Sequence, residues 1–161
     1  MISIHPAQPW HCGAMVRRMR DAQVNLAIML GRDAHADLRQ CQALSGFSRS
    51  WMDDGKIMAM MGVIGPLLAT DGVVWLVIAK EATQHPLLIA REAQRTLQFI
   101  MTIKHRLYAS PSSEDPRSVR FAEWLGFLRL PIDEEAKKVS AVPMVLSCDM
   151  QAYVGSVMRP N

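Results

Sequence analysis

The residues Val73-Val74-Trp75-Leu76-Val77-Ile78-Ala79 occupy seven apolar positions in succession, with no polar residue between them. Neighbouring side chains of a strand point to opposite faces of its sheet, so an apolar run without alternation predicts a strand covered on both faces. Asp71-Gly72 directly precedes the run and predicts a turn. We therefore expect Val73 to Ala79 to be the central strand of a sheet.

The two segments before this strand predict a hairpin. Phe47 to Met52 and Lys56 to Gly62 are separated by Asp53-Asp54-Gly55, and an Asp-Gly pair between two apolar segments is typical of a tight turn. Together with the central strand, they predict a three-stranded antiparallel meander.

The N-terminal part predicts a short strand and two helices. Ile2 to Ile4 forms the strand, and Gly31 ends the first helix. Asp33 caps a second, shorter helix. The apolar residues of the first helix recur at spacings of three and four, and they are Met15, Met19, Ala22, Leu26 and Met29.

The part after the central strand predicts two helices and three strands. Pro86 stands at the first position of a long helix, Leu87 to His105, with one apolar stripe. Asp115 caps the next helix, which starts at Pro116 and ends at Gly126. The stripe consists of Ile89, Ala93, Leu97 and Ile100, and the strands are Leu107 to Ala109, Phe127 to Leu130 and Val142 to Cys148.

This order of elements predicts an α+β fold, with a mixed, mostly antiparallel sheet flanked by helices. The 161 residues fit one domain, which we assign to residues 1–150, and residues 151–161 form a C-terminal tail. The tail carries apolar residues without a capping signal, so we expect it to contact another chain or to fold back onto the domain.

Composition limits the classes of function. Half of the residues are apolar, yet no apolar run is long enough to cross a membrane. The first residues lack the basic and apolar segments of a signal peptide, so we expect the cytoplasm of the producing cell. Three cysteines do not form a disulfide framework. Twelve methionines indicate an adaptable interface with a partner protein or with a second copy.

The stretch Arg120-Phe121-Ala122-Glu123-Trp124-Leu125-Gly126-Phe127 resembles the late helix of the GNAT (GCN5-related N-acetyltransferase) superfamily, which ends in leucine, glycine and phenylalanine. The order of elements resembles that superfamily over nearly the whole chain. The resemblance implies the acyl-CoA N-acyltransferase fold, in which Val73 to Ala79 would splay from the strand at Leu107 to Ala109.

The resemblance also implies a cofactor site in the loop after the central strand, where GNAT enzymes hold the pyrophosphate of acetyl-CoA on helix N-terminal amides. Their pattern is glutamine or arginine, two residues, glycine, one residue, then glycine or alanine. Aligned from Gln84, the small-residue positions hold Leu87 and Ile89; aligned from His85, they hold Leu88 and Ala90. Both alignments describe a degenerate site, and we expect no bound cofactor.

The catalytic positions implied by the resemblance also differ from the family. Many GNAT enzymes place a tyrosine four residues before the glycine of the late helix, to protonate the departing thiolate, and Ala122 stands there. Glu81 is the best candidate for a general base. The alternative for Glu81 is a solvated carboxylate beside Lys80.

Two functions stay open. The combination of a tryptophan-containing strand, a glycine-free loop and a long basic helix resembles GNAT-like internal or core proteins of short-tailed phages. This resemblance implies a non-catalytic virion or assembly protein. The alternative is an acetyl-CoA-dependent N-acetyltransferase acting on a primary amine.

Other sites are weaker candidates. His11 and Cys12 are adjacent, with His5 nearby, but no second pair at zinc spacing exists, so we predict no metal. A charged helix face is usually solvated, so nucleic-acid binding by the basic residues is a secondary possibility. These residues are Arg17, Arg18, Arg20, Arg91 and Arg95.

Overall fold

The structure is a computed structural model that describes residues 1–148, apart from the side chain of Leu26. Its strands are β1 (Ile2–Pro6), β2 (Ser45–Asp53), β3 (Lys56–Ile64), β4 (Asp71–Ile78), β5 (Arg106–Ala109), β6 (Leu128–Arg129) and β7 (Met144–Ser147). Its helices are α1 (Pro9–Val16), α2 (Asp21–Met29), α3 (Ala34–Leu44), α4 (Pro86–Met101), α5 (Pro116–Trp124) and α6 (Glu134–Lys138). A short 3-10 helix, η1 (Glu81–Gln84), joins β4 to α4. The C-terminal tail predicted from residue 151 lies outside the described residues.

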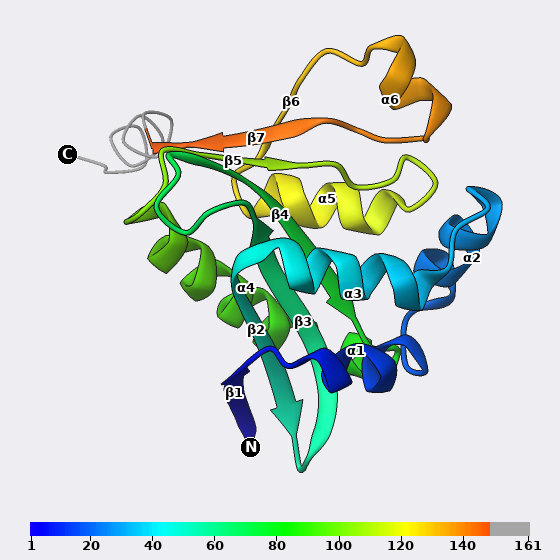
Figure 1. The fold of residues 1–161 in the computed structure, drawn as a ribbon, viewed down its shortest axis with the longest axis vertical. Helices are drawn as coiled ribbons and strands as arrows, with labels where there is room; N and C mark the ends of the chain where they lie inside the picture. The colour runs from blue at the N-terminus through cyan, green and yellow to red at the C-terminus, as the bar shows by residue number, and fades with distance from the viewer. Residues whose placement is uncertain (149–161) are drawn as a thin grey trace.

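The seven strands form one sheet in the order β1-β2-β3-β4-β5-β7-β6, so β4 is its central strand, as predicted. Strands β4 and β5 are the one parallel pair among the described strands. Their pairing covers three positions, from Asp71 with Arg106 to Val73 with Tyr108. Beyond Val73 the two strands separate. Figure 1 shows α3 in front of the sheet and α4 behind it.

The first predicted helix is interrupted, which corrects the interpretation of one helix through Met15 and Met29. Helix α1 ends at Val16 and α2 begins at Asp21. Between them, Met19 forms an isolated bridge with Ala79, and the Lys80 N–H donates to the Arg18 carbonyl. Pairing with the end of β4 therefore overrides the helical spacing of the apolar residues.

Most of the predicted boundaries are confirmed. Asp33 caps α3 by accepting hydrogen bonds from two backbone N–H groups, and Pro86 is the first residue of α4. Asp54-Gly55 forms the turn between β2 and β3, with positive φ at both residues. Gly126 follows α5 at φ 101°. Helix α4 ends four residues earlier than predicted, because residues 102–105 lead into β5.

The core takes up most of the methionines of the described residues, and the prediction of an interface built on methionine stays a prediction. Methionine is flexible enough to fill irregular gaps between a twisted sheet and its helices. The buried ones are Met15, Met19, Met58, Met60, Met61, Met101 and Met144. Among the described residues, no helix has the length and apolar character needed to cross a membrane.

Candidate functional site

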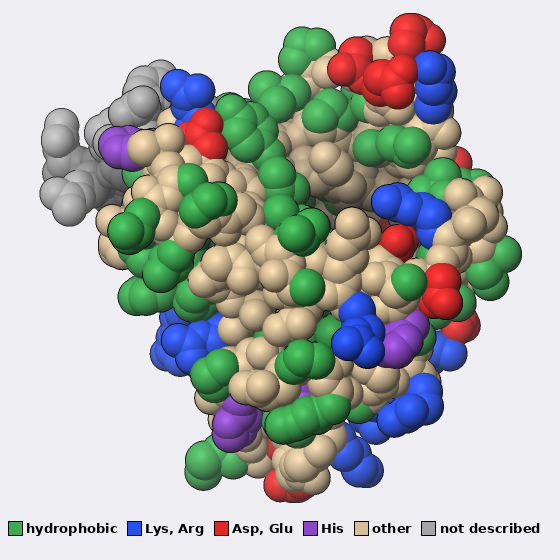
Figure 2. All heavy atoms as spheres, in the orientation of Figure 1, with side chains coloured by type: hydrophobic (Ala, Val, Ile, Leu, Met, Phe, Trp, Pro, Cys, Tyr) green, Lys and Arg blue, Asp and Glu red, His purple; other side chains and the backbone are tan. Residues whose placement is uncertain are grey.

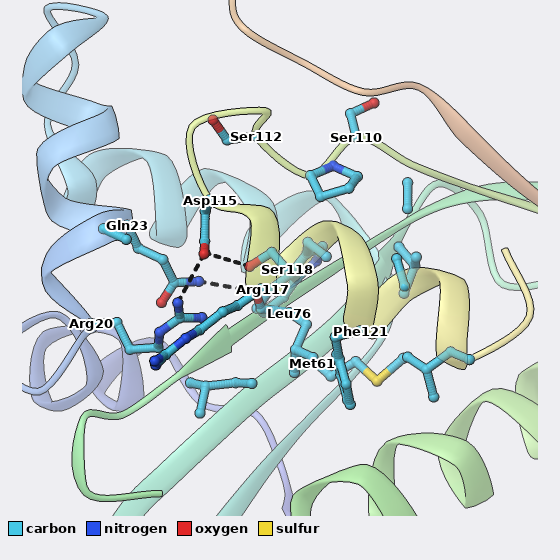
Figure 3. Close-up of a pocket in the computed structure, with 18 of the residues that line it drawn as sticks. Arg20, Gln23, Met61, Leu76, Ser110, Ser112, Asp115, Arg117, Ser118 and Phe121 are labelled. Carbon is cyan, nitrogen blue, oxygen red and sulfur yellow. Dashed lines mark hydrogen bonds and ion pairs between the residues drawn. The ribbon is translucent and has the colours of Figure 1, made fainter. Parts of the chain in front are cut away.

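The separation of β4 from β5 opens a cavity of about 840 Å³ at the centre of the molecule. One wall is β4, which contributes Val74, Trp75, Leu76 and Ile78. The other walls come from α2, α3, α4, α5 and the loop after β5. Figure 3 shows the α5 side of this cavity. These four side chains of β4 are apolar yet only partly buried, because they face open space.

The edge of β4 toward β5 carries backbone groups without a strand partner in the described chain beyond Val73. Residues of a strand direct their N–H and C=O groups alternately to its two sides. The Ala79 N–H donates to Met58 on the β3 side, whereas the Lys80 N–H donates to Arg18 on the opposite side. By this alternation, Leu76 directs its backbone groups away from β3, toward the cavity.

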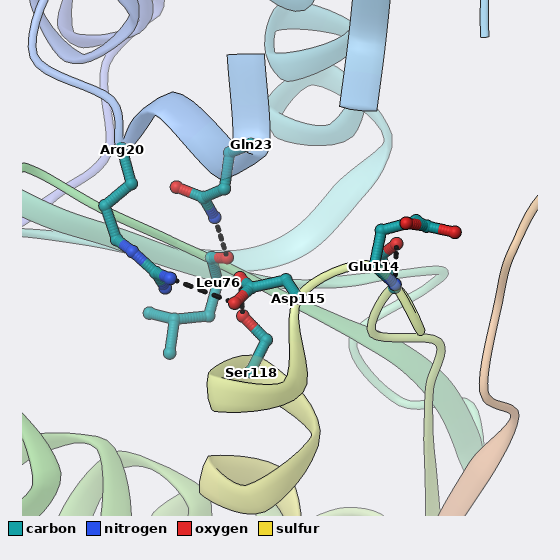
Figure 4. A network of polar contacts seen from close by, with 7 residues as sticks. Arg20, Gln23, Leu76, Glu114, Asp115 and Ser118 are labelled. Atoms are coloured by element: carbon teal, nitrogen blue, oxygen red, sulfur yellow. Dashed lines mark hydrogen bonds and ion pairs between the residues drawn. The ribbon is translucent and has the colours of Figure 1, made fainter. Parts of the chain in front are cut away.

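Gln23 of α2 confirms this direction. Its Nε2 donates to the Leu76 carbonyl at 3.4 Å. A side chain of α2 thus takes the place of a neighbouring strand at this point (Figure 4).

A buried ion pair closes one end of the cavity. Arg20 Nη2 lies 3.0 Å from Asp115 Oδ1, and the Ser118 hydroxyl donates to Asp115 Oδ2 at 2.6 Å (Figures 3 and 4). Burial alone would raise the pKa of Asp115. The hydrogen bond from Ser118 and the charge of Arg20 outweigh that effect and hold the pKa below its usual value. Asp115 is therefore an anion that connects the start of α2 to the start of α5.

The sequence predicted Asp115 as a helix cap and missed this role. Asp115 is the residue before Pro116, as expected, but its carboxylate makes no capping bond to the backbone of α5. It binds Arg20 and Ser118 instead. The pairing joins residues 95 positions apart, and no local pattern reports such a contact.

The predicted cofactor-loop residues lie beside the cavity but not in its lining. Gln84 and His85 end η1, and Leu87 begins the first turn of α4 with its side chain 82% exposed. Leu88 is exposed, and Ala90 is half-buried. Their neighbours line the cavity instead, and these are Thr83, Pro86 and Ile89. The role of the loop in phosphate binding stays a prediction.

The amides at the start of α4 are partly engaged within the helix. Pro86 has no N–H, and the N–H groups of Leu88 and Ile89 both donate to the His85 carbonyl. An anion at this point would have fewer donors than at an ordinary helix N-terminus.

The two predicted catalytic positions differ in their placement. Ala122 lines the cavity, so the position where the resemblance implies a tyrosine does face the open space. Glu81 is half exposed, lies 3.4 Å from Arg18 in an ion pair, and is not part of the lining. Its role as a base stays a prediction.

Of the remaining candidates, His11 makes contacts within the fold. His11 accepts a hydrogen bond from the Gln8 N–H at its Nδ1, which also lies 2.9 Å from the Ser50 hydroxyl, and burial lowers its pKa. Within residues 1–148, no three metal-ligating side chains come together. Acidic and basic side chains are scattered over the face in Figure 2, and the acidic group at its top lies over α6, which carries Glu134 and Glu135.

No protein-family model matches this sequence. No curated protein matches it. Solved structures do match over almost the whole chain. One is an acetyltransferase of the GNAT family from Streptococcus pneumoniae, with 15% identity, a TM-score of 0.58, and coverage of 91% of this chain and 99% of that chain.

Two further matches contain coenzyme A. The aminoglycoside acetyltransferase AAC(6')-Ib in complex with coenzyme A is 12% identical, with a TM-score of 0.67 and coverage of 95% and 98%. The spermidine N-acetyltransferase from Vibrio cholerae in complex with CoA and spermine is 13% identical, with a TM-score of 0.65 and coverage of 94% and 98%. The chain therefore has the GNAT acyl-CoA N-acyltransferase fold, which confirms the α+β prediction.

Proposed function

We propose that this protein binds the acyl-pantetheine arm of a CoA thioester in the cavity between β4 and β5 and transfers the acyl group to a primary amine. The observation that carries the proposal is the edge of β4 beyond Val73, which has no strand partner in the described chain and forms a wall of the cavity. Structures of the same fold with CoA bound support it.

The chemistry of the arm fits this wall. Pantetheine contains two amide groups, which can pair with backbone N–H and C=O groups as an added strand would. The apolar side chains of β4 exclude water around the thioester and strengthen polar interactions there. In the transfer, the amine nitrogen forms a bond to the thioester carbon and the C–S bond breaks. The nitrogen loses one proton and the departing sulfur takes one up.

The nucleotide end of the cofactor has a poorer site. In one alignment Leu87, and in the other Leu88, stands where close approach of the backbone needs a small side chain, and Pro86 lacks a donor. We therefore expect the arm to supply most of the affinity. A dissociation constant for acetyl-CoA on the order of 100 µM, about −5.5 kcal/mol, is consistent with such a site.

Calorimetric titration with acetyl-CoA tests the proposal on wild type and two tryptophan variants. Ala122→Trp places an indole in the cavity and should abolish binding without unfolding the protein, because the cavity can hold the ring. Glu123→Trp is the matched control, since the neighbouring Glu123 is exposed and does not line the cavity. Equal binding by both variants, or no binding by wild type, would contradict the proposal.

A non-catalytic assembly role, as in the phage proteins that the sequence resembles, is the second candidate. It is favoured by Ala122, which cannot protonate a thiolate, and by the exposed side chains of Trp10, Leu87 and Trp124. Light scattering of the protein with and without residues 151–161 tests it. A monomer in both forms that recovers no partner from its native source would exclude this role.

A further inference from the structure

Gln23 has one hydrogen-bonding group that nothing in the described structure satisfies. Its Oε1 is buried and has no donor among residues 1–148. The orientation of the amide is fixed, because only the nitrogen can face the Leu76 carbonyl, 3.4 Å away. A buried acceptor without a donor is costly, so this oxygen requires a donor from a ligand or from water.

The position of this oxygen identifies the ligand group. Gln23 lines the cavity at the free edge of β4, beside the Arg20–Asp115 pair (Figures 3 and 4). The two charges of that pair are satisfied by each other, and the other charged side chains of the lining, Arg32 and Arg117, disfavour a positive charge on the ligand. An acceptor oxygen in a largely apolar wall fits a ligand N–H.

We propose that Gln23 positions the acceptor amine: its Oε1 accepts one N–H of an unprotonated primary amine whose remaining part is apolar and carries no positive charge. This inference rests on the proposed function and adds to it the acceptor subsite. The hydrogen bond leaves the nitrogen lone pair free to attack the thioester carbon. Gln23 holds the amine and exchanges no proton with it.

Benzylamine is the probe, because it is a primary amine with an apolar remainder. Gln23→Met keeps the length of the side chain and removes the acceptor. With acetyl-CoA as donor, we expect the KM for benzylamine to rise about tenfold, the value of one hydrogen bond. The dissociation constant for acetyl-CoA should stay within about twofold of wild type. If Gln23 served only the fold, Gln23→Met would change kcat and thermal stability. It would not raise the KM for benzylamine while leaving the dissociation constant for acetyl-CoA unchanged.

Gln42→Met is the matched control. Gln42 makes the same kind of bond, from Nε2 to the Ala7 carbonyl at 3.4 Å, but lies outside the cavity lining. It should change neither the KM for benzylamine nor the affinity for acetyl-CoA. An unchanged KM in Gln23→Met, or an equal rise in Gln42→Met, would overturn the inference.

A second measurement separates this inference from the proposed function. In ¹⁵N-labelled protein without acetyl-CoA, the side-chain amide resonance of Gln23 is identified by its loss in Gln23→Met. If benzylamine shifts that resonance while wild type fails to bind acetyl-CoA, the amine subsite holds and the proposed function fails. A resonance that does not move at saturating benzylamine rejects the amine subsite.

Discussion

The two ends of the β4–β5 pair differ in how they are filled. At the end where the strands pair, the space around Gly72 is so full that a Cβ there would overlap Val63. At the other end the strands separate and leave the cavity. One strand therefore has a tightly packed end and an end that faces open space.

The polar groups at the two ends follow the same division. At the paired end, Lys104 is 3% exposed, and its Nζ lies close to backbone carbonyls of the loop before β4. These are the carbonyls of Pro66 at 3.0 Å, Leu67 at 3.2 Å, Ala69 at 2.8 Å and Asp71 at 3.5 Å. At the open end, Arg20 pairs with a side chain, Asp115. The paired end is therefore held by contacts of a side chain with backbone carbonyls, whereas the open end is held by contacts between side chains.

The largest effect should come from Lys104→Met at the paired end. The substitution removes a buried ammonium group that donates to several backbone carbonyls, so we expect the free energy of unfolding to fall by about 3 kcal/mol. Urea denaturation measures this change. Lys56→Met, at the exposed first residue of β3, should have almost no effect. A small loss in Lys104→Met would mean that water can replace the lysine and that the paired end is not sealed.

At the open end, Arg20→Met should cost somewhat less. It leaves the Asp115 carboxylate buried with one partner, Ser118, and we expect a loss of about 2 kcal/mol near neutral pH. Asp115 is ionised in the folded protein because its pKa lies below the usual value. Its contribution is complete above the unfolded pKa of about 4 and is lost as the pH falls through the lower folded value.

The pH dependence provides the control for this prediction. The difference in unfolding free energy between wild type and Asp115→Asn should shrink as the pH is lowered from about 7 toward about 3. A difference that stays constant over this range would show that the carboxylate stabilises the open end by packing and not by charge.

A third, smaller effect concerns the C-terminal end of α5. Gly126 has φ 101°, and a Cβ there would lie 3.4 Å from Leu146 Cδ1. Gly126→Val should therefore lower stability by about 1–2 kcal/mol, measured as a fall in melting temperature. An unchanged melting temperature would show that α5 can end without a glycine.

The smallest effect on stability is expected for Glu81→Gln. In the Arg18–Glu81 ion pair, the Glu81 side chain is half exposed to water. The free energy of unfolding should therefore change by less than about 0.5 kcal/mol. If Glu81 is the general base, acetyl transfer to benzylamine should nevertheless fall by about 100-fold. Unchanged transfer would assign Glu81 to the solvated surface.

The sequence predicted the parts that depend on neighbouring residues. The central strand, the Asp54-Gly55 turn, the Asp33 cap and the apolar stripe of α4 are all local patterns, and the structure confirms them.

The rest of the site depends on contacts that are remote in sequence. The break between α1 and α2 follows from Met19 pairing with Ala79, and the network at Asp115 follows from Arg20. Periodicity could not reveal these two contacts, because a methionine and an arginine at positions 19 and 20 also fit an uninterrupted amphipathic helix. The unsatisfied Oε1 of Gln23 is a property of packing and has no signal in the chain.

The free edge of β4 has a consequence for the rate at which its amide protons exchange with water. The central strand of a sheet ordinarily contains the slowest-exchanging amides of a protein. Here the amides of Trp75 and Val77 point toward β3 and should exchange slowly, whereas the amide of Leu76 between them faces the cavity. Slow and fast exchange should therefore alternate residue by residue along the middle of the sheet, and a ligand bound along β4 would erase that alternation.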